Sequence, residues 1–211
     1  MMEKEHSDIG AVTPEAIKIS RKSRRLISQL IGDETPEDRI RQRCVIATGD
    51  PSVAGILRFS HDPVQAGLGA LEVAAEILAD IRMVEAGIVK AGHRSPIRTF
   101  IGEGDDLAKR EGITRTSAGV LALQDKLEGS VVVIGNAPSA LLILCQLMES
   151  GRGRPRLVIG VPVGFVNAAE SKERLREMAI PSITTVGTRG GTPIAVACIN
   201  EIINLYARSG A

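Results

Sequence analysis

Hydrophobic residues follow two different patterns along this chain, and the patterns alternate. Residues 131–134 and 157–159 are short apolar runs, and each is followed by a glycine-bearing turn and a longer segment with apolar residues at helical spacing. A continuous apolar run is typical of a parallel strand covered on both faces, whereas recurrence every three to four residues indicates an amphipathic helix. The stretch from residue 128 to 178 therefore predicts two consecutive strand–turn–helix units.

The same alternation extends over most of the chain and predicts one sheet with helices around it. The strands expected to run parallel are residues 80–84, 97–101, 131–134, 157–159 and 182–186, and a further short strand is expected within 55–60. The other helices are expected at residues 14–31, 36–48, 64–78, 114–126 and 193–207, the first two beginning with a Thr-Pro-Glu capping signal. This order predicts an α/β fold, a doubly wound and mainly parallel Rossmann-like sheet with helices on both faces. We expect a single domain over residues 13–211, preceded by a flexible tail at 1–12.

Composition narrows the classes of function. The 211 residues, of which 44% are hydrophobic, suit one domain with a sizeable core. A net charge of +1 and an aromatic content of 2% give no support for nucleic-acid binding, which draws on basic surfaces and base stacking. No apolar run approaches the ~18 residues of a membrane span, and the charged start lacks the apolar core of a signal peptide. We therefore expect a cytoplasmic protein that binds neither nucleic acid nor membrane.

The cysteines and histidines do not suggest a disulfide framework or a metal site. The three cysteines lie far apart in apolar segments, at Cys44, Cys145 and Cys198. An odd, scattered set of this kind favours buried free thiols. Metal-ligand spacing is also absent among the three histidines, His6, His61 and His93, so we expect no metal.

Two turns follow the clearest strands and are expected to face each other. Gly135 and Asn136 come after the run at 131–134, and Gly164 and Phe165 come after the run at 157–159. Ligands of open α/β sheets bind outside the carboxyl ends of the strands, so these turns are candidates for one shared site. The alternative is that glycine and proline merely form tight connections here.

A helix start at Thr114 and Arg115 is a second candidate for ligand binding. Threonine is a preferred cap, and the start of a helix presents free backbone N–H groups that favour an anion. The pair therefore suits a carboxylate or phosphate group, although a capping threonine beside an exposed arginine would give the same sequence.

Six segments of the chain resemble one family in their order along the sequence. The segments are LRFS at 57–60, DIRMVEAGI at 80–88, GITRTSA at 112–118, GNAPSAL at 135–141, VIGVPVGFVNAAESK at 158–172 and GTRGGTP at 187–193. Together they are similar to the precorrin-8X methylmutase (precorrin isomerase) family of cobalamin biosynthesis. No single segment is specific, but six in order are.

The resemblance implies an isomerase. Family members move a methyl group from C-11 to C-12 of precorrin-8X or its cobalt form, and they work as homodimers with the cleft near the subunit interface. The rearrangement is intramolecular, so the resemblance implies no methyl donor and no other cofactor. The substrate is a large tetrapyrrole bearing many carboxylates, for which arginine is a suitable partner.

One position departs from the family pattern. The family's catalytic histidine lies in a His-Ala-x-Gly pattern before the LRFS segment, and counting back without a gap places Ile46 there. Isoleucine can neither donate nor accept a proton. His61 could supply an imidazole from a different backbone position, or it is simply a surface histidine in a turn. The acid therefore stays unassigned, and a catalytically silent corrinoid-binding relative, such as a carrier, is the alternative function.

The resemblance also implies a set of substrate contacts. Arg82 and Arg115 would clamp peripheral carboxylates, and Ser23 matches a family serine near the substrate. Backbone or amide groups at the strand-end turns would contact the edge of the ring. The full set of candidate contacts is Ser23, Thr48, Arg58, Arg82, Thr114, Arg115, Gly135, Asn136, Gly164, Phe165 and Arg189.

Overall fold

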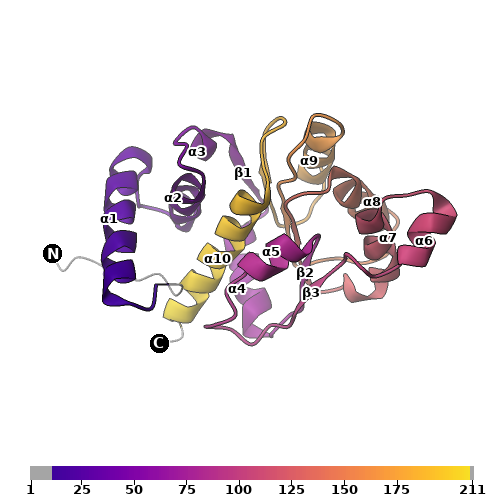
Figure 1. The fold of residues 1–211 in the computed structure, drawn as a ribbon, viewed down its shortest axis with the longest axis horizontal. Coiled ribbons are helices and arrows are strands. Elements are labelled where there is room, and N and C mark those ends of the chain that lie inside the picture. The colour runs from indigo at the N-terminus through magenta and orange to yellow at the C-terminus, as the bar shows by residue number, and fades with distance from the viewer. Residues whose placement is uncertain (1–10, 210–211) are drawn as a thin grey trace.

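A computed structural model describes residues 11–209 and contains one six-stranded sheet (Figure 1). The strands are β1 (Leu57–Ser60), β2 (Ile77–Ala79), β3 (Ile97–Thr99), β4 (Val131–Ile134), β5 (Leu157–Gly160) and β6 (Ser182–Thr185). Their order across the sheet is β1-β6-β5-β4-β2-β3. Strands β2 to β6 run parallel, and β1 pairs antiparallel with β6 at one edge. The mainly parallel, doubly wound sheet predicted from the sequence is confirmed.

Helices cover both faces of the sheet because its strands are apolar on both faces. In β4, Val131 and Val133 join one core cluster, while Val132 and Ile134 join the other. The first cluster is closed mainly by α2 (Pro36–Thr48), α4 (Pro63–Glu72), α5 (Arg82–Gly87) and α10 (Thr192–Ser209). The second is closed by α7 (Arg115–Ala122), α8 (Pro138–Glu149) and α9 (Ala168–Arg176). The remaining helices are α1 (Pro14–Ile31), α3 (Val53–Ile56), α6 (Asp105–Glu111) and the 3-10 helix η1 (Gln124–Lys126).

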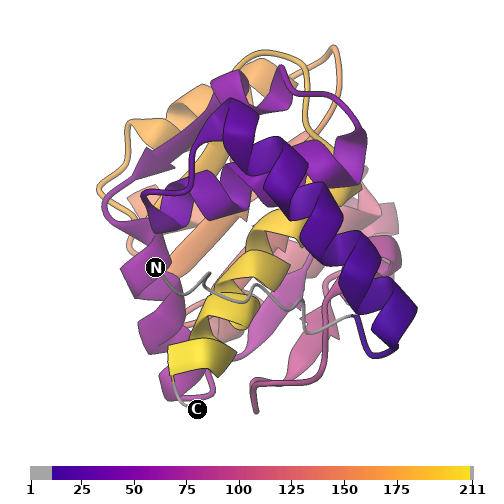
Figure 2. The same cartoon turned by 90° about the vertical axis from the view of Figure 1, so that its left-hand side faces the viewer.

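The first helix lies outside these layers. Figure 1 shows α1 at one end of the molecule, with α6, α7 and α8 at the other, and Figure 2 shows α1 crossing in front of the layer that holds α2 and α10. Both α1 and α2 begin where the sequence predicted. Thr13 Oγ1 accepts a hydrogen bond from Ala16 N at 3.2 Å, and Thr35 forms a capping box with Asp38. These local bonds satisfy N–H groups that the helix itself leaves free.

The strand predicted at 80–84 is wrong. The strand in this region is β2, and Arg82 is the first residue of α5. The predicted helix at 64–78 ends early, at Glu72, and Ala74 then takes a positive φ of 53°. The predicted helix was too long because apolar residues at helical spacing continue into β2. The three residues of β2 are too few to show the alternation that marks a strand.

Other boundaries moved by a few residues. The strand predicted at 97–101 ends at Thr99, and the helix predicted through residue 126 ends at Ala122 before the short 3-10 helix. Residues 53–56 are helical, so the first strand starts at Leu57. Of the expected tail at 1–12, residues 1–10 lie outside the described residues, as does His6.

All three cysteines are buried free thiols, as expected. Cys44 and Cys198 lie with their sulfur atoms 3.6 Å apart between α2 and α10. None of the helices in the described part of the chain is long and apolar enough to cross a bilayer.

Candidate functional site

The topological switch point of the sheet lies between β2 and β4, where a ligand crevice is expected outside the carboxyl ends of the strands. From β2 the chain moves to β3 on one side, and it returns to place β4, β5 and β6 on the other. The turns that follow β2 and β4 meet there through Asp80. Its Oδ2 atom accepts hydrogen bonds from Asn136 N at 2.7 Å and Ala137 N at 2.9 Å. Burial raises the pKa of Asp80, although these backbone N–H groups oppose that shift.

Two helix starts adjoin this crevice. Thr114 caps α7 as predicted, its Oγ1 accepting from Ser117 N at 3.2 Å. The same oxygen lies 2.9 Å from the hydroxyl of Ser139, in the first turn of α8. The amino ends of α7 and α8 are therefore neighbours, and both carry the partial positive charge that attracts an anion.

Arg115 is already engaged in an ion pair. Its Nε and Nη2 atoms donate to the two carboxylate oxygens of Asp105 at 2.9 and 2.8 Å. The hydrogen bond from Arg115 lowers the pKa of Asp105, and Asp105 in turn raises the pKa of Arg115. Both side chains are well exposed, at 57% and 41%, so solvent weakens the pair. A ligand carboxylate at Arg115 must therefore compete with Asp105.

Arg82 lies on the same side of the molecule. It lines a groove of about 460 Å³ together with Arg98, Glu103 and other residues around the edge strand β3. Its charge also contributes to lowering the pKa of Asp105. The structure thus brings Arg82, Asp105 and Arg115 into one charged group beside the crevice, and Asp105 is a member that the sequence reasoning missed.

The two predicted glycines have different roles. A Cβ on Gly135 would lie 2.9 Å from Ala195 Cβ and 3.1 Å from Thr192 Cα. Gly135 therefore allows the start of α10 to approach, which supports the plain packing interpretation at this position. Gly164 N donates to Thr188 O at 3.1 Å and so joins the loop after β5 to the loop after β6.

The loop after β5 presents apolar side chains to solvent. Phe165 is 94% exposed, Val166 75% and Val163 46%. Large apolar side chains gathered at such a tip suit contact with an apolar ligand or another protein.

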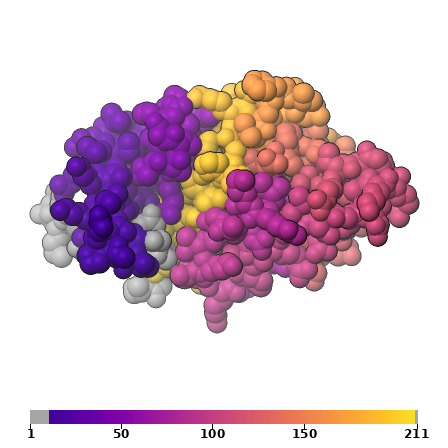
Figure 3. All heavy atoms as spheres, viewed as in Figure 1, coloured from indigo at the N-terminus to yellow at the C-terminus, as the bar shows by residue number. Residues whose placement is uncertain are grey.

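Arg189 links the loop after β6 to the segment that follows α2. Its Nη1 donates to Ser52 Oγ at 2.7 Å and to Asp50 Oδ2 at 3.2 Å. Its carbonyl oxygen accepts from Nζ of the buried Lys172 at 2.8 Å, and burial lowers the pKa of that lysine to about 8. In Figure 3 this loop emerges between the α3 region and the α9 region. The hydroxyl of Thr48, at the end of α2, donates to Cys44 O within its own helix.

The remaining candidates lie on α1, α2 and β1. Ile46, on the last turn of α2, is 39% exposed. Ser23 is half-buried on α1. The exposed Arg58 lies on the edge strand β1 and donates to the carbonyls of Gly55 and Leu57 at 2.9 Å.

His61 lies at the other end of the sheet from the crevice. It follows Ser60, which pairs with Ser182 at the start of β6. The crevice, by contrast, lies at the carboxyl ends of the parallel strands. The fold therefore does not bring the imidazole of His61 to the crevice.

Asp80 and Lys172 are the buried ionisable residues that sequence reasoning missed here. Asp80 directly follows three apolar residues, and a polar residue at the end of a strand is the signal that could have identified it. It was instead counted as the start of a strand. No cluster of three or more His, Cys, Asp or Glu side chains within residues 11–209 could hold a metal ion.

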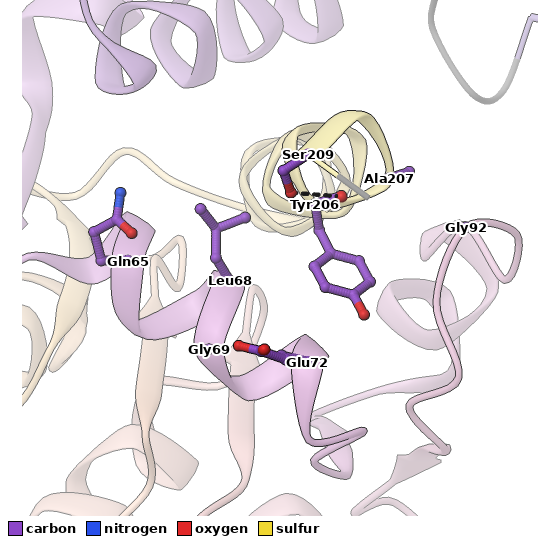
Figure 4. A pocket seen from close by; sticks show the side chains of 8 residues that line it. All are labelled: Gln65, Leu68, Gly69, Glu72, Gly92, Tyr206, Ala207 and Ser209. Atoms are coloured by element: carbon purple, nitrogen blue, oxygen red, sulfur yellow. Dashed lines mark hydrogen bonds between the residues drawn. The ribbon is translucent and has the colours of Figure 1, made fainter. Parts of the chain in front are cut away.

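A larger hollow of about 620 Å³ lies at the amino ends of the strands (Figure 4). It is lined mainly by α4 and α10, including Leu68, Glu72 and Tyr206. None of the predicted site residues lines it.

The strand order defines a doubly wound α/β protein, a class in which ligands bind at the switch point of the sheet. The CbiC family, described as precorrin-8X methylmutase, matches residues 18–205. The chain belongs to this family of isomerases, and the resemblance carried by the six segments is confirmed.

Several relatives match over nearly their whole length. The cobalt-precorrin-8 methylmutase of Methanocaldococcus jannaschii is 40% identical over 212 residues, covering 95% of this chain and 99% of the relative. The protein of the same name from Methanothermobacter thermautotrophicus is 42% identical, covering 93% and 97% of the two chains. The solved structure of precorrin-8X methylmutase from Thermus thermophilus matches with a TM-score of 0.83 at 35% identity, covering 92% of this chain and 98% of that one.

Proposed function

We propose that this protein moves a methyl group from C-11 to C-12 of precorrin-8X or its cobalt form, in the synthesis of the corrin ring. The observation that carries the proposal is the family match over residues 18–205, which spans every strand-end turn around the crevice. The relatives' names support a tetrapyrrole substrate. The reaction is an isomerisation, so it calls for no methyl donor and no redox cofactor. The cytoplasmic location expected from the sequence remains a prediction.

The charged group beside the crevice suits such a substrate. A tetrapyrrole with peripheral carboxylates gains charge-assisted, bidentate contacts from arginine. Arg82 and Arg115 are both exposed, and Arg115 is the first residue of α7, where backbone N–H groups favour an anion. Binding would displace or share Asp105, which now holds Arg115.

No residue is yet assigned as the general acid of this reaction. By spacing, Ile46 occupies the position of the family's catalytic histidine, and a general acid typically contributes ~10²–10⁴-fold to the rate. Ile46 therefore favours a second candidate function, a catalytically silent relative that binds and holds a corrinoid.

One assay separates these two functions. Purified protein is mixed with precorrin-8X or its cobalt form, and the absorption change on conversion to the corrin acid is followed. Conversion supports the isomerase, and tight binding without conversion supports the carrier. Neither binding nor conversion would refute both.

A histidine at position 46 gives a sharper test of the missing acid. Ile46→His should raise turnover by about 10²–10⁴-fold if the crevice is otherwise competent. Ala47→His is the matched control, because the neighbouring exposed position directs its side chain about 100° away around the helix. No increase in Ile46→His would contradict the assignment of residue 46 as the position of the acid.

We also propose a homodimer formed through α1. Ile19, Leu26 and Leu30 are 59%, 54% and 66% exposed. Their spacing puts them on one side of the helix, with the half-buried Ser23 among them. Another side of α1 packs on α2, so these three side chains are left exposed by their own chain. A second copy of the same helix face would cover them and would bring Ser23 to the interface.

The oligomeric state tests this proposal. Sedimentation should give a dimer for the wild-type protein and a monomer for the Ile19→Glu, Leu26→Glu double variant. Met83→Glu is the control, since Met83 is 67% exposed on α5. A wild-type monomer, or a double variant that remains dimeric, would refute an interface through α1.

A further inference from the structure

Helix α8 begins without a cap of its own. Its N-cap residue is Ala137, which has no side chain that could accept a hydrogen bond, and its first helical residue is Pro138. A helix start leaves N–H groups that must be satisfied by other partners. In this fold the partner is Asp80, whose carboxylate reaches across the switch point from the end of β2.

The carboxylate is held firmly in this place. Asp80 is 0% exposed, and its Oδ2 atom accepts from both Asn136 N and Ala137 N. Its Oδ1 atom is also buried and has no hydrogen bond of normal geometry. Burial raises the pKa of Asp80, while the surrounding backbone N–H groups favour the ionised carboxyl and oppose that shift. An ionised side chain in this position supplies a full negative charge where the helix presents about half a positive one.

The position of this charge matters because the next helix start is so close. Thr114 Oγ1 at the start of α7 lies 2.9 Å from Ser139 Oγ at the start of α8. Both starts could attract an anionic group of a ligand, but their carboxylate neighbours differ. The start of α8 is faced by the buried Asp80, whereas Asp105 beside α7 is exposed and paired with Arg115. Solvent weakens this exposed ion pair, so Arg115 is open to a competing anion, whereas the buried Asp80 faces α8 permanently.

We propose that Asp80 is a positioning residue that orients Asn136 and neutralises the start of α8, so that anionic groups of the ligand are directed to the start of α7 and Arg115. The identity of the ligand as a carboxylate-rich tetrapyrrole rests on the proposed function. The action of Asp80 on the two helix starts rests on the contacts above alone.

The first experiment compares Asp80→Asn with the wild-type protein. Asparagine has nearly the same shape, and its amide oxygen can still accept from the two N–H groups, so the fold should be retained. Without the charge, the start of α8 competes for carboxylates. The tetrapyrrole should bind about two- to fivefold more tightly. The value of kcat should fall, by up to about 10²-fold if the ring shifts by 1 Å.

A purely structural role of Asp80 would not make the variant bind the ligand more tightly while its kcat falls. The control is Asp125→Asn, which removes the same charge from the exposed 3-10 helix. Unchanged binding and turnover in Asp80→Asn would overturn the proposal.

The second experiment does not depend on the proposed function. Inorganic sulfate is titrated into the protein while backbone amide signals are followed by NMR. In the wild type, sulfate should shift amides at 115–117 and leave Ser139 unmoved, whereas in Asp80→Asn it should shift Ser139 as well. In Asp80→Ala, the amides of Asn136 and Ala137 should exchange faster with solvent.

The two experiments fail in distinguishable ways. A wild-type protein that neither binds nor converts the tetrapyrrole would refute the proposed function, and the sulfate titration would then decide the role of Asp80. Equal sulfate shifts at Ser139 in the wild type and in Asp80→Asn would refute the neutralisation of α8.

Discussion

The carboxylate of Glu201 on α10 is expected to hold the outer helical layer together. Its side chain is 0% exposed, and three arginines from two other helices donate to it. Arg24 of α1 is itself only 4% exposed, while Arg39 and Arg43 of α2 approach the carboxylate at 3.2 Å each.

Replacing Glu201 by glutamine should therefore be severely destabilising. Removing one partner of a buried ion pair typically costs 3–5 kcal/mol, because the opposite charge stays buried without compensation. For a chain of this size, 1 kcal/mol corresponds to about 2–4 °C in Tm, so Glu201→Gln should lower Tm by about 6–20 °C. Thermal unfolding followed by circular dichroism measures this shift, with the exposed Glu170→Gln on α9 as the control.

A double-mutant cycle tests the reason behind that value. Glu201→Gln combined with Arg24→Met removes both a buried charge and its principal partner. The double variant should be less destabilised than the sum of the two single variants, by about 0.5–3 kcal/mol. Strictly additive effects, or a Tm drop in Glu201→Gln of less than about 2 °C, would refute the view that buried charge compensation holds α1 in place.

Three further predictions concern other parts of the fold. Burial lowers the pKa of Lys172 to about 8 from 10.5, so the unfolded chain binds more protons between these pH values and the free energy of unfolding should rise with pH there. Urea unfolding at pH 7.5 and pH 10 should show this rise in the wild type and lose it in Lys172→Met. Gly119→Ala would put a Cβ 2.2 Å from the carbonyl oxygen of Phe100 and should lower the free energy of unfolding by roughly 1–3 kcal/mol. Gly69→Ala on α4 meets no atom within 4 Å and should raise it by about 0.5–1 kcal/mol. Chemical denaturation measures both changes. Asp105→Asn should strengthen tetrapyrrole binding several-fold, because Arg115 loses its competing partner, and titration calorimetry would contradict this if affinity fell.

The parts of the fold that could be predicted from the sequence are those with a local signal. Residues 131–134 are apolar at every position because alternate side chains enter the two core clusters. Thr13 and Thr35 mark their helices because a cap bonds to the turn that immediately follows it. Strand β2 was missed because its three residues follow a helical pattern and precede further apolar residues, so no change of period is visible.

The residues of the candidate site likewise include some that a local sequence signal marks and others that no local signal marks. Thr114 could be predicted because capping is local, but the partners of the other side chains are distant in sequence. Asp80 meets Asn136 across 56 positions, and Arg189 meets Asp50 across 139. Such pairs follow from the order of strands in the sheet, and a single sequence carries no direct signal of them. The resemblance supplied the candidate list, whereas the ion pair between Arg115 and Asp105 emerged only from the fold.

The burial of every cysteine has a practical consequence for studying this protein. Burial raises the pKa of Cys145 to about 12, and the pKa of Cys198 is raised beside its neighbour Cys44, so little reactive thiolate forms at these sites near neutral pH. A cysteine introduced at the fully solvated Phe165 would thus be the preferred target of a maleimide dye. Fluorescence from that label would report when the loop after β5 meets a tetrapyrrole, without any native sulfur having to be removed.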